Sequence, residues 1–173
     1  MEISHKRKEF DPILYNEKDY QGKVLATKIL SQSKLYKNGT CIILDPFEDK
    51  QCGDIKIKYV DNFILNYEIE CSGYIRFEKN FNNEYSLVNV PMKNFKAIPD
   101  GFFMAVDDSE SIEKEIPERF YLIEVKDILN AEKTSNVNKF SNGKLEYFYK
   151  VPSHLVKRYM WNEKTETYKC VKQ

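Results

Sequence analysis

The stretch GDIKIKYVDNFILNYEIEC, residues 53–71, decides the fold that this sequence predicts. Residues 53–59 and 63–71 both alternate between apolar and polar side chains, and both runs are rich in β-branched and aromatic residues. This two-residue period is typical of half-buried β-strands. The three residues between the runs, 60–62, predict a tight turn, so we expect the whole stretch to form a β-hairpin.

The polar face of this hairpin carries carboxylates. Side chains two residues apart on a strand share a face, so Glu68 and Glu70 lie on the same side of the second strand. If Tyr59 pairs with Phe63 across the turn, Asp54 lies opposite Glu68, to within one residue pair. Like charges that face each other across a sheet destabilise it. The pattern therefore requires either a bound cation or neutralising lysines.

A hard divalent cation would relieve the repulsion among Asp54, Glu68 and Glu70. Mg²⁺ and Mn²⁺ take oxygen ligands and are commonly held by one or two carboxylates together with waters and substrate phosphates. Such an ion polarises a phosphodiester and lowers the pKa of the attacking water. The alternative is a solvated strand face on which Lys56 and Lys58 pair with Glu68 and Glu70.

The segments around the hairpin predict further strands and two helices. Residues 19–35 carry an apolar stripe at helical spacing, which Asn38-Gly39 would stop, and Ser153 would cap a second helix over 153–161. Strands are predicted at 40–45, 84–91, 101–106, 119–125 and 145–152, a solvated loop or a short helix at 107–118, and a loop at 134–144. Consecutive strands between helices indicate a mixed α+β or α/β domain with a central mixed β-sheet flanked by helices.

Length and composition bound the organisation of the chain. Its 173 residues predict a single domain over 1–173, in which the charged residues 1–12 form a loosely packed tail. The 27 basic and 27 acidic side chains cancel, so any anion-binding surface would have to come from local clustering. Aromatic side chains make up 14% of the chain, too many for a disordered protein.

Other composition signals narrow the setting and the chemistry. The four cysteines have no zinc-ligand spacing, no signal peptide precedes them, and no apolar run is long enough to span a membrane. We therefore predict a reduced, cytoplasmic protein with no membrane partner. His5 and His154 are the only histidines, so histidine-based metal and triad schemes lack their parts.

The order of these features resembles the PD-(D/E)xK, or restriction-endonuclease-like, nuclease superfamily. A helix is followed by a strand, by GD opening a second strand (53–54), and by the acidic pair ExE on a third (68–70). The stretch LVNVPMKNFK (87–96) is similar to a Val/Ile-Pro-x-Arg/Lys strand of small phage-type members. EYFYKVPSHLVKRY (146–159) is similar to a Tyr/Phe-x-Val-Pro element near their C-terminus, so the resemblance spans residues 15–159.

The resemblance implies a restriction-endonuclease-like fold, a site and a cofactor. Asp54 matches the metal-ligating aspartate, Glu68 the acidic (D/E) position, and Glu70 the position usually held by lysine. Asp54, Glu68 and Glu70 would then hold Mg²⁺ or Mn²⁺. A nearby lysine, for which Lys93 is the candidate, would orient the water or stabilise the phosphate.

The chain departs from the family pattern at the last position of the motif. It reads EIE at 68–70, where the pattern places lysine two residues after the acid. In a register two residues later, Glu70 is the ligand and Ser72 stands where lysine should be. Lys93, in the stretch after the next strand, is then the lysine that replaces it. An acidic residue of the first helix could complete the site, either Glu17 or Asp19.

A rival site has to be weighed against this one. Glu124 and Lys126 form a literal ExK at the end of a predicted strand, and Asp107 or Asp108 ends the strand before it. An acidic, proline-bearing loop separates the two strands, and no helix directly precedes the first. We rank this pair second.

The sequence thus predicts a metal-dependent endonuclease that hydrolyses DNA phosphodiester bonds, with a homodimer as a further expectation. Lysines around the hairpin would supply a positive rim for nucleic acid, namely Lys93, Lys96, Lys144 and Lys150. The alternative, motivated by the missing motif lysine, is a catalytically inactive binding protein of the same fold, either a phage-encoded inhibitor or a DNA-binding accessory.

Overall fold

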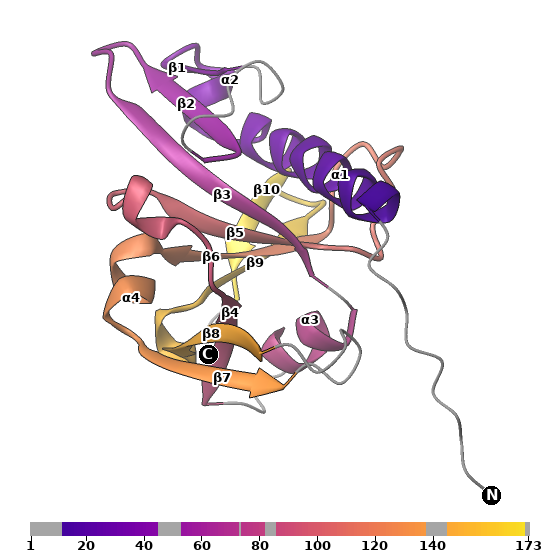
Figure 1. Ribbon diagram of the computed structural model, residues 1–173. Helices are drawn as coiled ribbons and strands as arrows, with labels where there is room; N and C mark the ends of the chain where they lie inside the picture. The colour runs from indigo at the N-terminus through magenta and orange to yellow at the C-terminus, as the bar shows by residue number, and fades with distance from the viewer. Residues whose placement is uncertain (1–11, 45–52, 73, 82–85, 138–144, 172–173) are drawn as a thin grey trace, which may run out of the picture.

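The computed structural model describes residues 12–44, 53–72, 74–81, 86–137 and 145–171, and these form two β-sheets with short helices around them (Figure 1). The larger sheet has seven strands, in the spatial order β1 (Cys41–Ile43), β2 (Ile55–Tyr59), β3 (Ile64–Ser72), β5 (Phe102–Asp107), β6 (Arg119–Glu124), β9 (Lys157–Asn162) and β10 (Thr167–Cys170). The smaller sheet has the order β4 (Leu87–Pro91), β8 (Leu145–Pro152) and β7 (Glu132–Val137).

The larger sheet is mixed. Strands β3 and β5 pair in parallel, with Tyr67 opposite Phe102 and Ser72 opposite Asp107. The other neighbouring pairs in this sheet are antiparallel. The mixed α+β class that the sequence predicted is therefore confirmed.

Each face of the larger sheet is covered by a different layer. Helix α1 (Pro12–Ser31) packs on one face, where its buried residues Leu25, Ala26 and Ile29 meet Ile69 of β3 and Met104 of β5. The short helix α2 (Lys34–Lys37) follows α1 and leads into β1. Figure 1 shows α1 running beside β3 on the side away from the smaller sheet.

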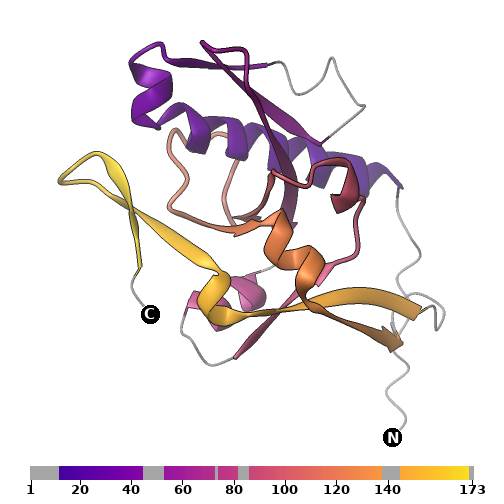
Figure 2. The same cartoon turned by 90° about the vertical axis from the view of Figure 1, so that its left-hand side faces the viewer.

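The opposite face carries the smaller sheet and two helices, α3 (Tyr74–Phe81) and α4 (Val125–Asn130). Phe103 and Tyr121 of the larger sheet pack there against Tyr149 of β8. Phe77 of α3 and Ile128 of α4 complete this second core. Two short 3₁₀ turns, η1 (Phe95–Ala97) and η2 (Ser153–Leu155), follow β4 and β8. Figure 2 shows this layering and the β9–β10 hairpin extending from the body.

Several predicted elements are confirmed, with shifted ends. The predicted hairpin is the pair β2–β3, and the strands predicted around it correspond to β1, β4, β5, β6 and β8. The first helix begins at Pro12, earlier than predicted, and ends at Ser31. Asn38-Gly39, predicted to stop this helix, instead follows the separate helix α2, and Gly39 there has φ +69°. The predicted loop at 107–118 joins β5 to β6.

The predicted C-terminal helix over 153–161 is wrong. Helical turns are confined to the short 3₁₀ segment Ser153–Leu155, and Lys157–Asn162 form strand β9. The reason is a distant partner, because β9 pairs with the edge of β6 and Tyr159 stacks on Phe120 at 4.9 Å between ring centroids. Such pairing outweighs a local helix-capping signal.

The loop predicted at 134–144 is also partly wrong, because residues up to Val137 belong to β7, which pairs with β8. The rest of that loop, 138–144, lies outside the described residues, as does the predicted tail up to residue 11. The sequence analysis did not predict α3, α4 or β10. Within the described ranges, no helix combines the length and the apolar character needed to cross a lipid bilayer.

Candidate functional site

The predicted register of the hairpin is confirmed. Ile55 lies opposite Tyr67, and the Tyr59 N–H donates to the Phe63 carbonyl at 2.9 Å. Asp54 lies one residue before β2, where the regular pairing ends at Ile55, and its negative charge acts on Glu68. Its backbone N–H donates to the Tyr67 carbonyl at 2.7 Å, so the backbone of Asp54 is fixed against β3.

Strand β3 continues beyond Tyr67, which pairs with the first residue of β2. Along this stretch, charged side chains form hydrogen bonds with the backbone of β3 in place of β2. The Ile69 N–H donates to Asp54 Oδ2 at 2.8 Å. The Ile69 carbonyl accepts a hydrogen bond from Lys93 Nζ, also at 2.8 Å. Backbone groups at a part-buried edge need partners, and here a carboxylate and an ammonium supply them in place of a neighbouring strand.

Lys93 joins this edge to Glu68. It lies in the loop between β4 and η1, and its Nζ is 3.2 Å from Glu68 Oε1. Burial lowers the pKa of the Lys93 ammonium, but the charges of Glu68, Glu70 and Asp54 outweigh that effect, so the pKa is raised overall. Lys93 is therefore a cation paired with Glu68 and stabilised by the charges of two further carboxylates near the start of β2.

Glu68 is itself partly removed from solvent. The Glu68 side chain is 23% exposed. Burial raises the pKa of its carboxyl group, and the negative charge of Asp54 raises it further. The positive charges of Lys93 and Lys23 oppose this rise. Mutual repulsion between Asp54 and Glu68, which the register predicted, is thus present in the structure and is offset by two lysines.

Helix α1 contributes the second lysine. Lys23 Nζ is 3.3 Å from Asp54 Oδ1 and 3.0 Å from Asp19 Oδ2, and its side chain is only 13% exposed. Gly22 lets the helix approach β3 closely, because a Cβ there would lie 3.3 Å from both the Cys71 and Ile69 side chains. The sequence analysis missed Lys23, although its spacing of four residues from Asp19 was a usable signal.

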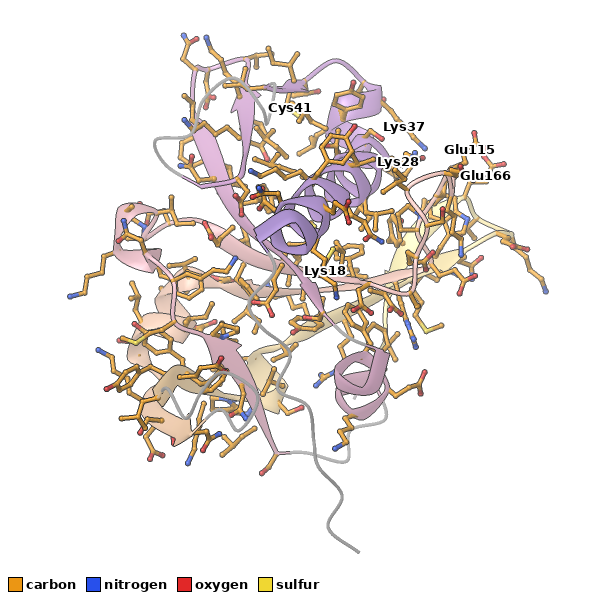
Figure 3. The ribbon with its side chains drawn as sticks, turned by 45° about the vertical axis from the view of Figure 1, so that its right-hand side comes forward. Lys18, Lys28, Lys37, Cys41, Glu115 and Glu166 are labelled. Atoms are coloured by element: carbon orange, nitrogen blue, oxygen red, sulfur yellow. The ribbon has the colours of Figure 1, made fainter. Side chains whose placement is uncertain are left out.

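A cavity of about 410 Å³ opens beside this charged cluster. It lies at the free edge of β3, between the first turns of α1 and the end of β4, and is lined by Lys18, Asp19, Ile69, Glu70, Cys71, Pro91, Met92 and Lys93. Lys18, labelled in Figure 3, projects from α1 and pairs with Asp108 at 3.1 Å. Both charge signs therefore meet on the cavity wall.

The structure decides between several alternatives that the sequence left open. Ile55 lies opposite Tyr67 and not opposite Ile69, so the register that would have placed Ser72 in the lysine position is not adopted, and Ser72 is buried. Glu68 forms an ion pair with Lys93, which the alternative of a solvated strand face did not predict.

Of the two acidic residues considered on the first helix, Asp19 lies at the site and Glu17 is exposed. The structure describes only some of the lysines that were predicted to form a positive rim for nucleic acid. Lys96 is exposed on η1, Lys150 lies 4.0 Å from Glu132 on the smaller sheet, and Lys144 lies outside the described residues.

The rival site is not assembled, and that interpretation is wrong. Glu124 lies opposite Phe102 at the start of β5, whereas Asp107 ends the same strand. Five residues of strand place these carboxyl groups roughly 16 Å apart along the sheet. Asp107 is bound by Arg119 at 2.6 Å, and Glu124 pairs with Lys126 at 2.6 Å.

The donor atoms around Lys93 suit a hard divalent cation. The Lys93 ammonium contacts a Glu68 oxygen and the Ile69 carbonyl oxygen, and Asp54 Oδ2 accepts from the N–H of the same Ile69, so oxygen atoms of the kind that such ions prefer lie along this edge. In the part of the chain that the structure describes, no group of three or more His, Cys, Asp or Glu side chains is disposed to hold a metal. Glu70 as a third carboxylate ligand therefore stays a prediction.

Comparisons of this chain with protein-family models, with curated proteins and with solved structures found no match.

Proposed function

We propose that this protein is a metal-dependent nuclease of the restriction-endonuclease-like fold that hydrolyses phosphodiester bonds of DNA. The observation that carries the proposal is the charged cluster at the start of β2, in which Lys93 pairs with Glu68 and Lys23 pairs with Asp54 beside an open cavity. Support for the fold comes from the chain order of a helix, a strand, an aspartate before the second strand and an acidic pair on the third.

Asp54, Glu68 and the Ile69 carbonyl would hold Mg²⁺ or Mn²⁺. When bound, the ion would supply polarisation of the phosphodiester and a lower pKa for the attacking water. One or two carboxylates are enough for such an ion, since waters and substrate phosphates supply its remaining ligands.

The chain's own residues hold this arrangement in place. The Ile69 N–H and Lys23 fix the two oxygens of Asp54, so the carboxylate cannot rotate away from Glu68. Lys93 faces the cavity and would place positive charge next to a phosphate lying there. Lys18, at the same cavity, would contact the neighbouring phosphate of the strand.

The test is cleavage of plasmid, branched and single-stranded DNA in the presence of Mg²⁺. We expect the wild-type protein to cut at least one of these substrates, and Asp54→Asn to lose at least a hundredfold in rate, because the amide keeps the hydrogen bond to Ile69 but not the charge. Circular dichroism provides the folding control. Undiminished cutting by a folded Asp54→Asn protein would refute the proposal.

A second candidate is a binding protein of the same fold that has lost catalysis. The observation that favours it is that Lys23 and Lys93 already balance Asp54 and Glu68, so the cluster is neutralised without a metal. This candidate predicts no heat on titration with Mg²⁺ and no cleavage with any divalent metal, while affinity for DNA or a protein partner persists.

A further inference from the structure

We propose that a cavity at the end of α1 is a binding site for a small planar aromatic acid. The cavity has a volume of about 350 Å³, which is within the range of small-molecule sites in proteins. It lies between the last turn of α1 and the β9–β10 hairpin that Figure 2 shows extending from the body. Tyr67 lines this cavity, whereas the next residue, Glu68, projects from the opposite face of β3. The inference is therefore independent of the proposed function.

The walls of the cavity are mostly apolar and aromatic. They include Ile29, Leu30, Met104, Phe120, Tyr159 and Tyr168. Tyr159 stacks on Phe120 with 4.9 Å between ring centroids and an interplanar angle of 9°, and Tyr168 meets the same Phe120 ring edge-on at 4.9 Å. The Tyr168 hydroxyl donates to the Pro117 carbonyl at 2.6 Å, which fixes the Tyr168 ring. Aromatic rings held in this way favour a planar aromatic ligand.

Tyr67 gives the cavity a buried hydrogen-bonding group. Tyr67 is 7% exposed, yet its hydroxyl has no hydrogen-bond partner among the residues that the structure describes. Buried polar groups are nearly always hydrogen-bonded, so this hydroxyl is available to a molecule that enters the cavity. Burial raises the pKa of the Tyr67 hydroxyl, and the nearby Tyr59, Cys41 and Tyr159 raise it further. The hydroxyl therefore keeps its proton and can donate to a polar atom of the ligand.

Lys34 supplies the charge that favours an acid. It is the first residue of α2, it is exposed, and it forms no ion pair within the described part of the chain. The other described residues that line the cavity are uncharged, so its wall carries a single positive charge where it meets solvent. A ligand that matches these groups has a flat apolar body, a carboxylate at one end for Lys34 and a polar ring substituent for Tyr67.

The test uses 6-hydroxy-2-naphthoate, a rigid two-ring acid whose hydroxyl and carboxylate lie at opposite ends. Titration of the full chain, followed by the fluorescence of the naphthalene ring, should show saturable binding with a dissociation constant below about 1 mM. We expect 2-naphthoate, which lacks the hydroxyl, and 2-naphthol, which lacks the carboxylate, to bind roughly two- to tenfold more weakly.

Two variants assign the polar contacts. Tyr67→Phe removes only the buried hydroxyl, so it should weaken binding of 6-hydroxy-2-naphthoate by about two- to tenfold and leave the affinity for 2-naphthoate unchanged. Lys34→Met should weaken binding of both naphthoates by about two- to fivefold and leave the affinity for 2-naphthol unchanged. Lys37→Met is the matched control, because Lys37, labelled in Figure 3, lies on the same helix α2 but does not line the cavity. Its affinities should equal those of wild type.

Thr167→Trp blocks the cavity while leaving Tyr67 and Lys34 in place. Thr167 lines the cavity from β10 and is partly exposed, so a large side chain there replaces no core residue and should abolish saturable binding. Circular dichroism provides the folding control for each variant.

The inference is refuted if wild type binds none of the three compounds, because the cavity then holds only water. Undiminished binding by a folded Thr167→Trp protein would also overturn it, as would an equal loss of affinity for both naphthoates in Tyr67→Phe. These titrations contain neither Mg²⁺ nor DNA, so their failure would leave the nuclease proposal standing, and loss of cleavage in Asp54→Asn would not affect them.

Discussion

Arg119 should be indispensable to the fold because it neutralises a carboxylate that water cannot reach. The Asp107 side chain is 1% exposed, and its Oδ2 accepts a hydrogen bond from Arg119 Nε at 2.6 Å. Ser109 binds the other oxygen through its N–H and its hydroxyl. Arg119 also lies 5.6 Å from the ring centroids of Phe77 and Phe81, so its position is fixed by packing as well as by charge.

Arg119→Met keeps much of the packing volume but leaves Asp107 buried without its cation. Breaking a buried pair in this way costs about 3–5 kcal/mol of unfolding free energy. Urea unfolding followed by circular dichroism measures the change. The double variant Arg119→Met with Asp107→Asn should recover part of the loss, because Asp107 no longer carries a buried charge, whereas the 2.9 Å ion pair of Arg119 with Glu78 stays broken.

The control for charge alone is Lys126→Met, which breaks a solvent-exposed pair and should lower stability far less than Arg119→Met, by less than about 1 kcal/mol. A loss below about 1 kcal/mol for Arg119→Met would refute the reasoning, because a buried pair would then behave like a surface one. So would a double variant that is less stable than Arg119→Met. Either result would return Asp107 to consideration as part of a site rather than of the fold.

Two further changes test the electrostatics and the packing. Hydrogen bonds and charge from Lys126 and Lys157 lower the pKa of Glu124 in the folded protein. The Glu124 carboxylate therefore stabilises the fold above the ordinary glutamate pKa of about 4.3, and this stabilisation is lost as the pH falls through the lowered pKa of the folded state. The stability difference between wild type and Glu124→Gln, measured by urea unfolding, should therefore be largest near neutral pH and vanish in acid; a difference that grows on acidification would contradict the assignment. Gly101→Ala should destabilise the protein by about 1–3 kcal/mol, because a Cβ there would lie 2.6 Å from the Asn66 carbonyl oxygen and the backbone must shift. Equal thermal stability of Gly101→Ala and wild type would show that β3 and the start of β5 yield more easily than their close approach implies.

The hairpin could be predicted from the sequence because its signals are local. Alternation at 55–59 and 64–72 determines the faces, and a turn of fixed length determines the pairing of β2 with β3. The predicted register of the hairpin was accordingly correct from Ile55 to the turn. Elements of this kind need no knowledge of distant parts of the chain.

The C-terminal region could not be predicted in the same way, because its partner is distant in sequence. A capping serine at Ser153 favours a helix locally, yet Tyr159 pairs with Phe120 of β6 and the segment becomes β9. Arg158 is 1% exposed in that strand, which no local pattern indicates. Pairing and burial supplied by β6 decided the outcome.

The candidate site was predictable only in part, for a similar reason. Lys93 was placed near the carboxylates by the resemblance of its stretch to a nuclease family, and the structure brings it to Glu68. Lys23 reaches Asp54 only because α1 crosses β3 closely at Gly22, a packing feature that spacing does not encode. Ion pairs between residues of different helices and strands could thus be identified only from the structure.

The central claim is that Asp54, Glu68 and the Ile69 carbonyl form the cation seat of this protein, and paramagnetic Mn²⁺ tests it most directly. Substoichiometric Mn²⁺ should selectively broaden the backbone amide resonances of residues 54, 68 and 69 in a nitrogen-15 spectrum, and Asp54→Asn should abolish that effect. Broadening centred on other carboxylates, such as Glu110 and Glu118, or identical broadening in the folded Asp54→Asn protein, would contradict the account.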